Sequence, residues 1–86
     1  MELIIQLGES GKVCLRVNTS TIEMQDSWQG MYFPDYPVEL EIIKLEKNQK
    51  FLGWYSKEGQ LISNENKIIL CLHNGRNTIY PKFEFI

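Results

Sequence analysis

The sequence predicts an all-β fold, or an α+β fold dominated by strands, and three observations point to it. The chain contains no alanine, and its good helix formers are scattered among isoleucine, valine, threonine and aromatic residues, which favour strands. Hydrophobic and polar residues alternate in several short segments, as is typical of half-buried strands. No segment keeps a helical period over several turns. We therefore expect a small single sheet or a sandwich of about seven short strands.

The amino-terminal part contains two segments that together predict a β-hairpin. Residues 2–7 are mostly apolar, and residues 8–11 read Gly-Glu-Ser-Gly, which is a turn signal. Residues 12–18 then alternate, so that every second residue from Val13 lies on one face. Residues 21–24 are expected to form a further short strand.

The carboxyl-terminal part contains the clearest strand signal. Val38 opens a segment, residues 38–43, in which apolar residues alternate with two glutamates. The spacing of apolar residues also permits a helix over residues 38–47, but β-branched residues favour the strand. In residues 78–86, Pro81 cannot donate a ladder hydrogen bond, so this strand is predicted to be bulged or at a sheet edge. The remaining predicted strands cover residues 50–55, 60–62 and 67–72.

Phe51 and Trp54 form the predicted centre of the hydrophobic core. They have opposite parity in a regular strand, and a β-bulge at Gly53 would turn both rings to the same side. The core is completed by residues on the buried faces of other predicted strands: Val38, Leu40 and Phe83.

Length and charge limit the classes of function. With 86 residues and 43% hydrophobic residues, the chain (residues 1–86) is expected to be a single globular domain. The formal net charge is −2 and no basic stripe is present, so we expect no nucleic-acid partner. No apolar run approaches the length of a membrane helix, so no membrane insertion is expected. Residues 3–5 are too short for a signal-peptide core, and an export signal would have to lie upstream.

An aromatic cluster in residues 25–36 is the candidate binding site. Breakers at Gly30 and Pro34 predict an irregular loop here. Two interpretations are open: the rings form a stacking platform for a sugar or peptide, or the loop covers an open face of the sheet. In the second case, two of the rings would be buried and two exposed. The predicted ligand-binding residues are Trp28, Tyr32, Phe33 and Tyr36, of which Trp28 and Phe33 would be the buried pair.

The residue types that carry catalysis are not grouped in a recognisable motif. Cys14 and Cys71 are far apart in sequence and not in a CxxC context, so free thiols are favoured over a disulfide. His73 is expected to be an exposed residue at a strand end. Glu39 and Glu41 share one strand face, where a solvated surface is favoured over a catalytic carboxylate pair. We therefore expect no enzyme activity, no metal site and no cofactor.

Several segments, in their order along the chain, resemble a known type of bacterial domain. Residues 37–41 (PVELE), 50–55 (KFLGWY) and 77–83 (NTIYPKF) resemble the internalin-type B-repeat. Residues 11–19 (GKVCLRVNT) and 28–33 (WQGMYF) resemble the C-terminal accessory domain of spore-coat CotH-type proteins. The chain departs from the B-repeat pattern at Lys44-Leu45, where a proline is usual, and at Asn48-Gln49, where Gly-Tyr is usual.

The resemblance implies a location and a role. It implies an extracellular, cell-surface or spore-associated bacterial protein in which this domain follows a kinase-like catalytic domain. The B-repeat relatives have a β-grasp-like fold, so a helix or helical turn packed on the sheet is also implied. The expected function is that of a non-catalytic accessory or interaction module with a spacer, adhesion or oligomerisation role, whose partner is a neighbouring domain. A carbohydrate- or peptide-binding module is the first alternative, and an immunoglobulin-like sandwich that mimics the motif is the second.

Overall fold

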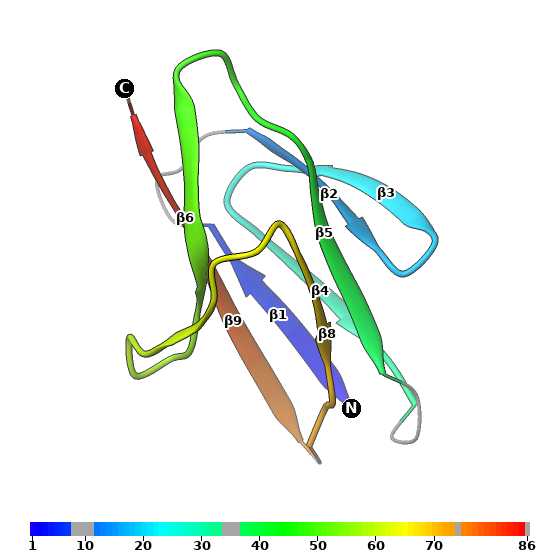
Figure 1. Cartoon of the computed structure of the whole chain (residues 1–86). Helices are drawn as coiled ribbons and strands as arrows, with labels where there is room; N and C mark the ends of the chain where they lie inside the picture. Colours follow the sequence, from blue (N-terminus) through cyan, green and yellow to red (C-terminus); the bar gives the residue numbers. More distant parts are fainter. Residues whose placement is uncertain (8–11, 34–36, 74, 86) are drawn as a thin grey trace.

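The computed structural model describes residues 1–7, 12–33, 37–73 and 75–85, and these residues form an all-β sandwich (Figure 1). They contain nine strands and no helix, so the predicted fold class is confirmed. The strands are β1 (Glu2–Gln6), β2 (Val13–Val17), β3 (Ser20–Met24), β4 (Ser27–Met31), β5 (Val38–Lys44), β6 (Gln49–Tyr55), β7 (Leu61–Ser63), β8 (Lys67–Leu70) and β9 (Arg76–Phe85).

The strands are divided between two sheets. The five-stranded sheet has the order β4-β1-β9-β6-β7, and the four-stranded sheet has the order β3-β2-β5-β8. Neighbouring strands are antiparallel except for β1 and β9, which are parallel. Only β2–β3 and β6–β7 pair with the strand that follows them in the chain, so most connections cross from one sheet to the other.

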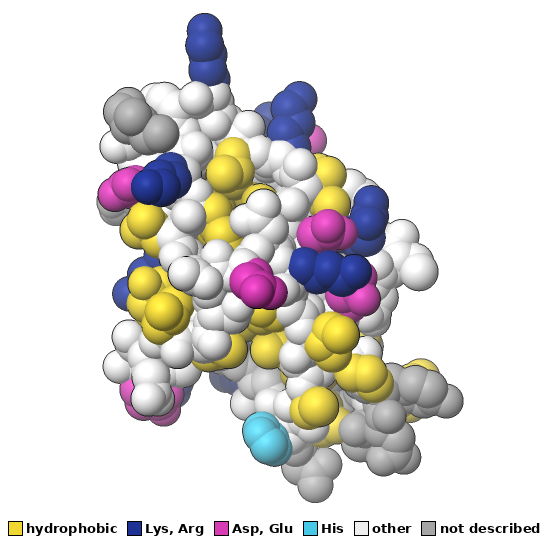
Figure 2. All heavy atoms as spheres, viewed as in Figure 1, with side chains coloured by type: hydrophobic (Ala, Val, Ile, Leu, Met, Phe, Trp, Pro, Cys, Tyr) yellow, Lys and Arg dark blue, Asp and Glu magenta, His cyan; other side chains and the backbone are white. Residues whose placement is uncertain are grey.

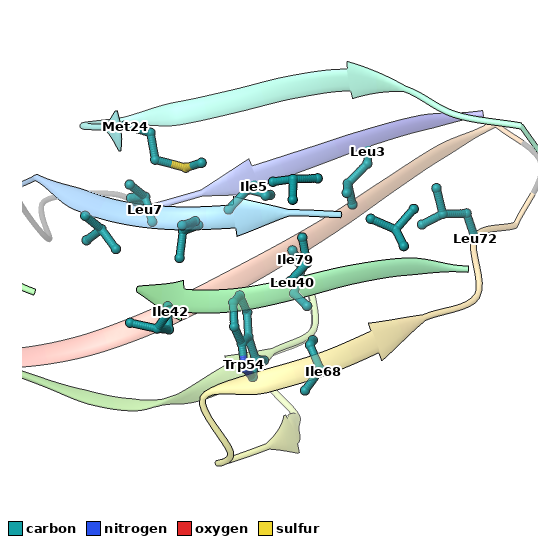
Figure 3. Close-up of a cluster of buried hydrophobic side chains, with 14 residues drawn as sticks. Leu3, Ile5, Leu7, Met24, Leu40, Ile42, Trp54, Ile68, Leu72 and Ile79 are labelled. Atoms are coloured by element: carbon teal, nitrogen blue, oxygen red, sulfur yellow. The ribbon is translucent and has the colours of Figure 1, made fainter. Parts of the chain in front are cut away.

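The core lies between the sheets and consists of every second residue of the central strands. In β1, Leu3 and Ile5 are completely buried, and β2 and β5 bury alternate residues in the same way. Figure 3 shows these side chains between the two layers, with Trp54 close to Leu40 and Ile68. The predicted core residues Val38, Leu40 and Trp54 are 0–1% exposed, whereas Phe51 and Phe83 are partly buried and pack against the core.

The bulge predicted in the Trp54 strand is present. The register between β6 and β9 shifts between Phe51 and Gly53, and the rings of Phe51 and Trp54 meet edge-on with centroids 5.2 Å apart. Gly53 has a φ of +149°, and a Cβ there would approach the backbone oxygen of Ser63 to 2.9 Å. Glycine is therefore required at the bulge, because it is the residue that tolerates both this φ and this close approach.

The predicted amino-terminal hairpin is wrong. β1 pairs with β4 and β9, whereas β2 pairs with β3 and β5 in the other sheet. Both segments carry a buried apolar face, and the structure packs these two faces against each other across the core. Local alternation indicates that a strand has a buried face, but it does not indicate which strand lies beside it.

Pro81 lies in a central strand, so the predicted edge position of the last strand is wrong. β9 lies between β1 and β6 in the sheet. The pairing of β9 with β1 reaches only to Ile79, however, so Pro81 lies where β9 is paired on the β6 side alone. The missing N–H is tolerated because this stretch behaves locally as an edge. The bulge lies opposite, in β6.

The sandwich differs from the predicted arrangement of about seven strands and from the β-grasp-like fold that the resemblance implies. The structure has nine described strands instead of about seven, and the strand that the sequence did not predict is β4, which replaces a predicted loop. In place of the helix implied by a β-grasp-like fold, a second sheet covers the first among the described residues. Two sheets face each other as in an immunoglobulin-like sandwich.

Candidate functional site

The predicted aromatic platform is mostly part of the sandwich. Residues 27–31 form strand β4, which pairs with β1 and places Trp28 opposite Ile5 and Gly30 opposite Leu3. Trp28 therefore faces inward at the edge of the core. Its ring lies against Gly30, where an added Cβ would come within 2.4 Å of the ring atom Cη2. A ring packed against its own strand does not offer a free face for stacking with a ligand.

The other predicted platform residues are dispersed. Tyr32 is half-buried, and its ring centroid lies 6.3 Å from that of Trp28. Burial raises the pKa of Tyr32 above its usual value of 10.0. Phe33 is 75% exposed, which contradicts its predicted burial. Tyr36 lies outside the described residues.

The prediction of an aromatic loop failed for a simple physical reason. The segment was expected to be irregular, but its backbone continues to pair with the first strand, where Tyr32 N donates to Met1 O at 2.8 Å. In an extended strand successive side chains point to opposite faces. Trp28, Gly30 and Tyr32 thus face the core and Met31 and Phe33 face away. Treated as a strand, the segment places Trp28, Gly30 and Tyr32 on one face, but the apolar Met31 and Phe33 on the other face mean that its sequence does not indicate which face is buried.

A different surface gathers half-buried aromatic rings and polar groups. The outer face of the five-stranded sheet points away from the four-stranded sheet, and it was not singled out from the sequence. It carries one of every two side chains of β4, β1, β9 and β6, as the registers place them. Its members are Gln29, Met31, Glu2, Ile4, Gln6, Arg76, Thr78, Tyr80, Lys82, Leu52 and Tyr55.

One end of this outer face is hollowed. β1 ends at Gln6 while β9 continues beside β6, and a hollow of about 350 Å³ lies at this point. Gln6, Leu52, Tyr80 and Lys82 contribute to its lining, together with buried apolar residues at its base. We call it the Tyr80 hollow. Beside it, the Lys82 ammonium lies 4.5 Å from the centre of the Tyr55 ring, a cation–π contact.

The opposite end of the outer face carries both apolar and charged side chains. Met31 is 72% exposed and, like Phe33, points to solvent. Next to Met31 in the register lies Glu2, which accepts a hydrogen bond from Arg76 Nε at 2.6 Å and another from the Gln29 amide. The outer face therefore combines large apolar side chains with amide, carboxylate and cationic groups. That combination suits binding of an amphipathic ligand or a protein surface.

The titratable candidates do not form a catalytic or metal-binding group. Cys14 and Cys71 are both free thiols, as favoured from the sequence, and His73 is exposed just beyond β8. Glu39 pairs with Lys67 at 3.2 Å and Glu41 with Arg16 at 3.0 Å, so both are cross-strand ion pairs on a solvated face. Among the described residues, no three His, Cys, Asp or Glu side chains are placed to hold a metal ion.

A second hollow, of about 230 Å³, lies beside Cys14 and is lined by charged residues. Lys12 Nζ contacts Glu23 Oε1 at 3.3 Å, and the backbone N–H of Lys12 donates to Glu46 Oε1 at 3.1 Å. These contacts pair both carboxylates at the hollow, those of Glu23 and Glu46, with groups of Lys12. The Tyr80 hollow, with its half-buried Tyr80 ring and Gln6 amide, is the better candidate for a ligand.

No protein-family model, curated protein or solved structure matches this chain. In the part of the chain that the structure describes, no helix is long and apolar enough to cross a membrane.

Proposed function

We propose that this domain is a non-catalytic accessory module of a larger exported bacterial protein and that it binds its neighbouring domain through the outer face of the five-stranded sheet. The observation that carries the proposal is the exposure of Met31 (72%) and Phe33 (75%) on the same side as the Tyr80 hollow. Exposed large apolar side chains rimmed by polar groups mark interaction surfaces. The bacterial, surface or spore-associated location rests on the sequence resemblance given above.

The outer face has the composition of a transient interface. Apolar side chains lie at both ends, at Met31 and at Leu52, and polar groups such as Gln6 and Gln29 lie between and around them. Interfaces between domains of one chain are more polar than obligate interfaces. An adhesive or spacer module needs this kind of surface, and it needs no reactive group.

The test is a titration of the isotope-labelled domain with the neighbouring domain encoded by the same gene. We expect amide shift changes to be confined to β1, β4, β6 and β9. We also expect Tyr80→Ala to weaken binding by about tenfold or more, as for an aromatic anchor in an interface. Phe85→Ala is the matched control, because Phe85 is a 57% exposed aromatic at the end of β9 outside the hollow. Shift changes elsewhere, or equal losses in both variants, would contradict the proposal.

A carbohydrate- or peptide-binding module is the second candidate, and the Tyr80 hollow favours it. Tyr80 supplies a planar ring, and Gln6 and Lys82 supply hydrogen-bond donors at its rim. The binding residues would then be these, in place of Trp28 and Tyr32. A glycan and peptide array with the wild-type domain and Tyr80→Ala distinguishes this candidate: it predicts signals that disappear in the variant.

A further inference from the structure

The free edge of strand β8 is a second candidate binding surface, separate from the outer face of the five-stranded sheet. β8 ends the four-stranded sheet and pairs only with β5 among the described strands. In Figure 2, hydrophobic side chains gather over the segment that Figure 1 labels β8, whereas charged side chains cover the neighbouring β5. Ile69 of β8 is 63% exposed and Ile62 of β7 is 49% exposed. Both line a hollow of about 500 Å³ along this edge.

The hydrogen-bonding pattern shows which backbone groups the edge presents. Ile42 N donates to Asn66 O at 2.8 Å, and the register continues with Leu40 opposite Ile68. In an antiparallel ladder, hydrogen-bonded pairs alternate along the strand. The even-numbered residues of β8 therefore bond to β5. The N–H and C=O groups of Lys67 and Ile69, and of Cys71 if the strand is extended by one residue, point away from the sheet.

The other edge strand of this sheet, β3, is protected against pairing with another chain, whereas the β8 edge is not. β3 presents exposed Ser20, Thr21 and Glu23, and Glu23 pairs with Lys12. Charged and polar residues at an edge discourage pairing with another chain. In β8 the one charge is Lys67, and Glu39 of the same sheet already pairs with it. An edge strand of the sequence K-I-I-L thus offers free backbone groups and an apolar side chain.

We propose that the β8 edge binds the β8 edge of a second copy of this chain, in an antiparallel pairing about a two-fold axis at Ile69. This proposal goes beyond the proposed function, because it concerns a different surface and a different partner. Strand addition of this kind supplies main-chain hydrogen bonds, and side-chain contacts set the register. The two four-stranded sheets would become one continuous eight-stranded sheet.

The charges and the geometry select the register. In an antiparallel pair the axis can lie at a hydrogen-bonded pair, here Lys67, Ile69 or Cys71, or at a non-hydrogen-bonded pair, here Ile68 or Leu70. An axis at Ile68 or Leu70 places Ile69 opposite Lys67 or Cys71 of the second copy, so it does not bring the two exposed isoleucines together. An axis at Lys67 places two ammonium groups opposite each other, and an axis at Cys71 leaves Ile69 opposite His73, beyond the end of β8. An axis at Ile69 pairs the two isoleucines and places Lys67 opposite Cys71 of the second copy. An isologous contact of this type closes after two copies.

The contact area indicates weak association. A single strand edge with the neighbouring Ile62 buries less than the roughly 1,600 Å² of a standard stable interface. We therefore expect a concentration-dependent dimer, which sedimentation over a wide range of concentration detects. Ile69→Lys should abolish the dimer without changing the melting temperature, since Ile69 is exposed. Ile43→Lys is the matched control, because Ile43 is 40% exposed in β5 of the same sheet but not at an edge.

Cross-linking tests the register directly. In the variant Cys14→Ser/Lys67→Cys, the proposed pairing brings residue 67 opposite Cys71 of the second copy at a Cα separation of about 5.5 Å, which a disulfide can span. With oxidised glutathione as oxidant we expect a covalent dimer of twice the 10.1 kDa chain mass. Cys14→Ser/Thr21→Cys, with the new thiol on β3, should stay monomeric under the same conditions.

The outcomes separate this proposal from the proposed function. A chain that stays monomeric at every concentration, or equal cross-linking of the two cysteine variants, overturns the pairing at β8. The titration of the outer face with the neighbouring domain is independent of that result. A monomer whose β8 amide signals shift on addition of a synthetic peptide of residues 67–72 would also overturn the dimer, in favour of strand addition by an extended segment.

Discussion

Replacing Trp54 by alanine is the sharpest test of the sandwich. Trp54 is 0% exposed and is the largest fully buried side chain in the described residues. Its ring packs edge-on against Phe51, and Nε1 donates to Glu65 O at 2.7 Å. Removal of a buried Trp or Phe side chain costs about 3–5 kcal/mol. The lost hydrogen bond leaves Glu65 O, part-buried in the same contact, without this donor, at a further cost of about 1 kcal/mol.

This loss is large relative to the total free energy of unfolding of the domain. For 86 residues, the general per-residue scale gives a free energy of unfolding of about 4–13 kcal/mol. A loss of about 4 kcal/mol lowers the melting temperature by roughly 15–30 °C in a domain of this size. Trp54→Ala should therefore unfold at a much lower urea concentration than the wild type, or be unfolded already.

The assay is urea unfolding followed by far-UV circular dichroism, because Trp28 would confuse a fluorescence signal. Trp54→Phe separates the two contributions: it keeps most of the apolar volume and loses the indole N–H. We expect it to fall between the wild type and Trp54→Ala. Phe85→Ala, at an exposed position, should stay within about 0.5 kcal/mol of the wild type. A Trp54→Ala midpoint close to that of Phe85→Ala would refute the placement of the indole in the core.

Three further outcomes are expected. Gly30→Ala should cost about 1–3 kcal/mol in urea unfolding and change the near-UV dichroism of Trp28, because the new Cβ overlaps its ring; an unchanged spectrum would argue against that packing. Asn77→Ala should cost about 1–2 kcal/mol, since its amide bonds the backbone N–H and C=O of His73 at 2.9 and 2.8 Å; a neutral effect would show that this clamp is dispensable. Tyr32, whose pKa is raised by burial above 10.0, holds its proton more tightly when folded, so stability should fall as pH rises above about 10. Tyr32→Phe should remove that part of the loss in alkaline melting curves, and identical pH profiles would count against the burial.

The residues that carry regular alternation were predictable because the side-chain period of a strand is a local property. Val38 and Leu40 are buried as their pattern indicates. The bulge at Gly53 was predictable for a related reason: two large rings of opposite parity had to share one core. The candidate site was not predictable in the same way. Tyr80 and Leu52 lie about 30 residues apart in sequence and come together only because β6 and β9 are neighbours.

The sequence by itself determined which segments are extended and which of their faces are apolar, because period-two burial is set by the backbone geometry of a single strand. Only the tertiary structure decided which strands pair, since one apolar face packs equally well against several others. It was this choice that placed β1 beside β9, turned Phe33 to solvent and left the β8 edge open.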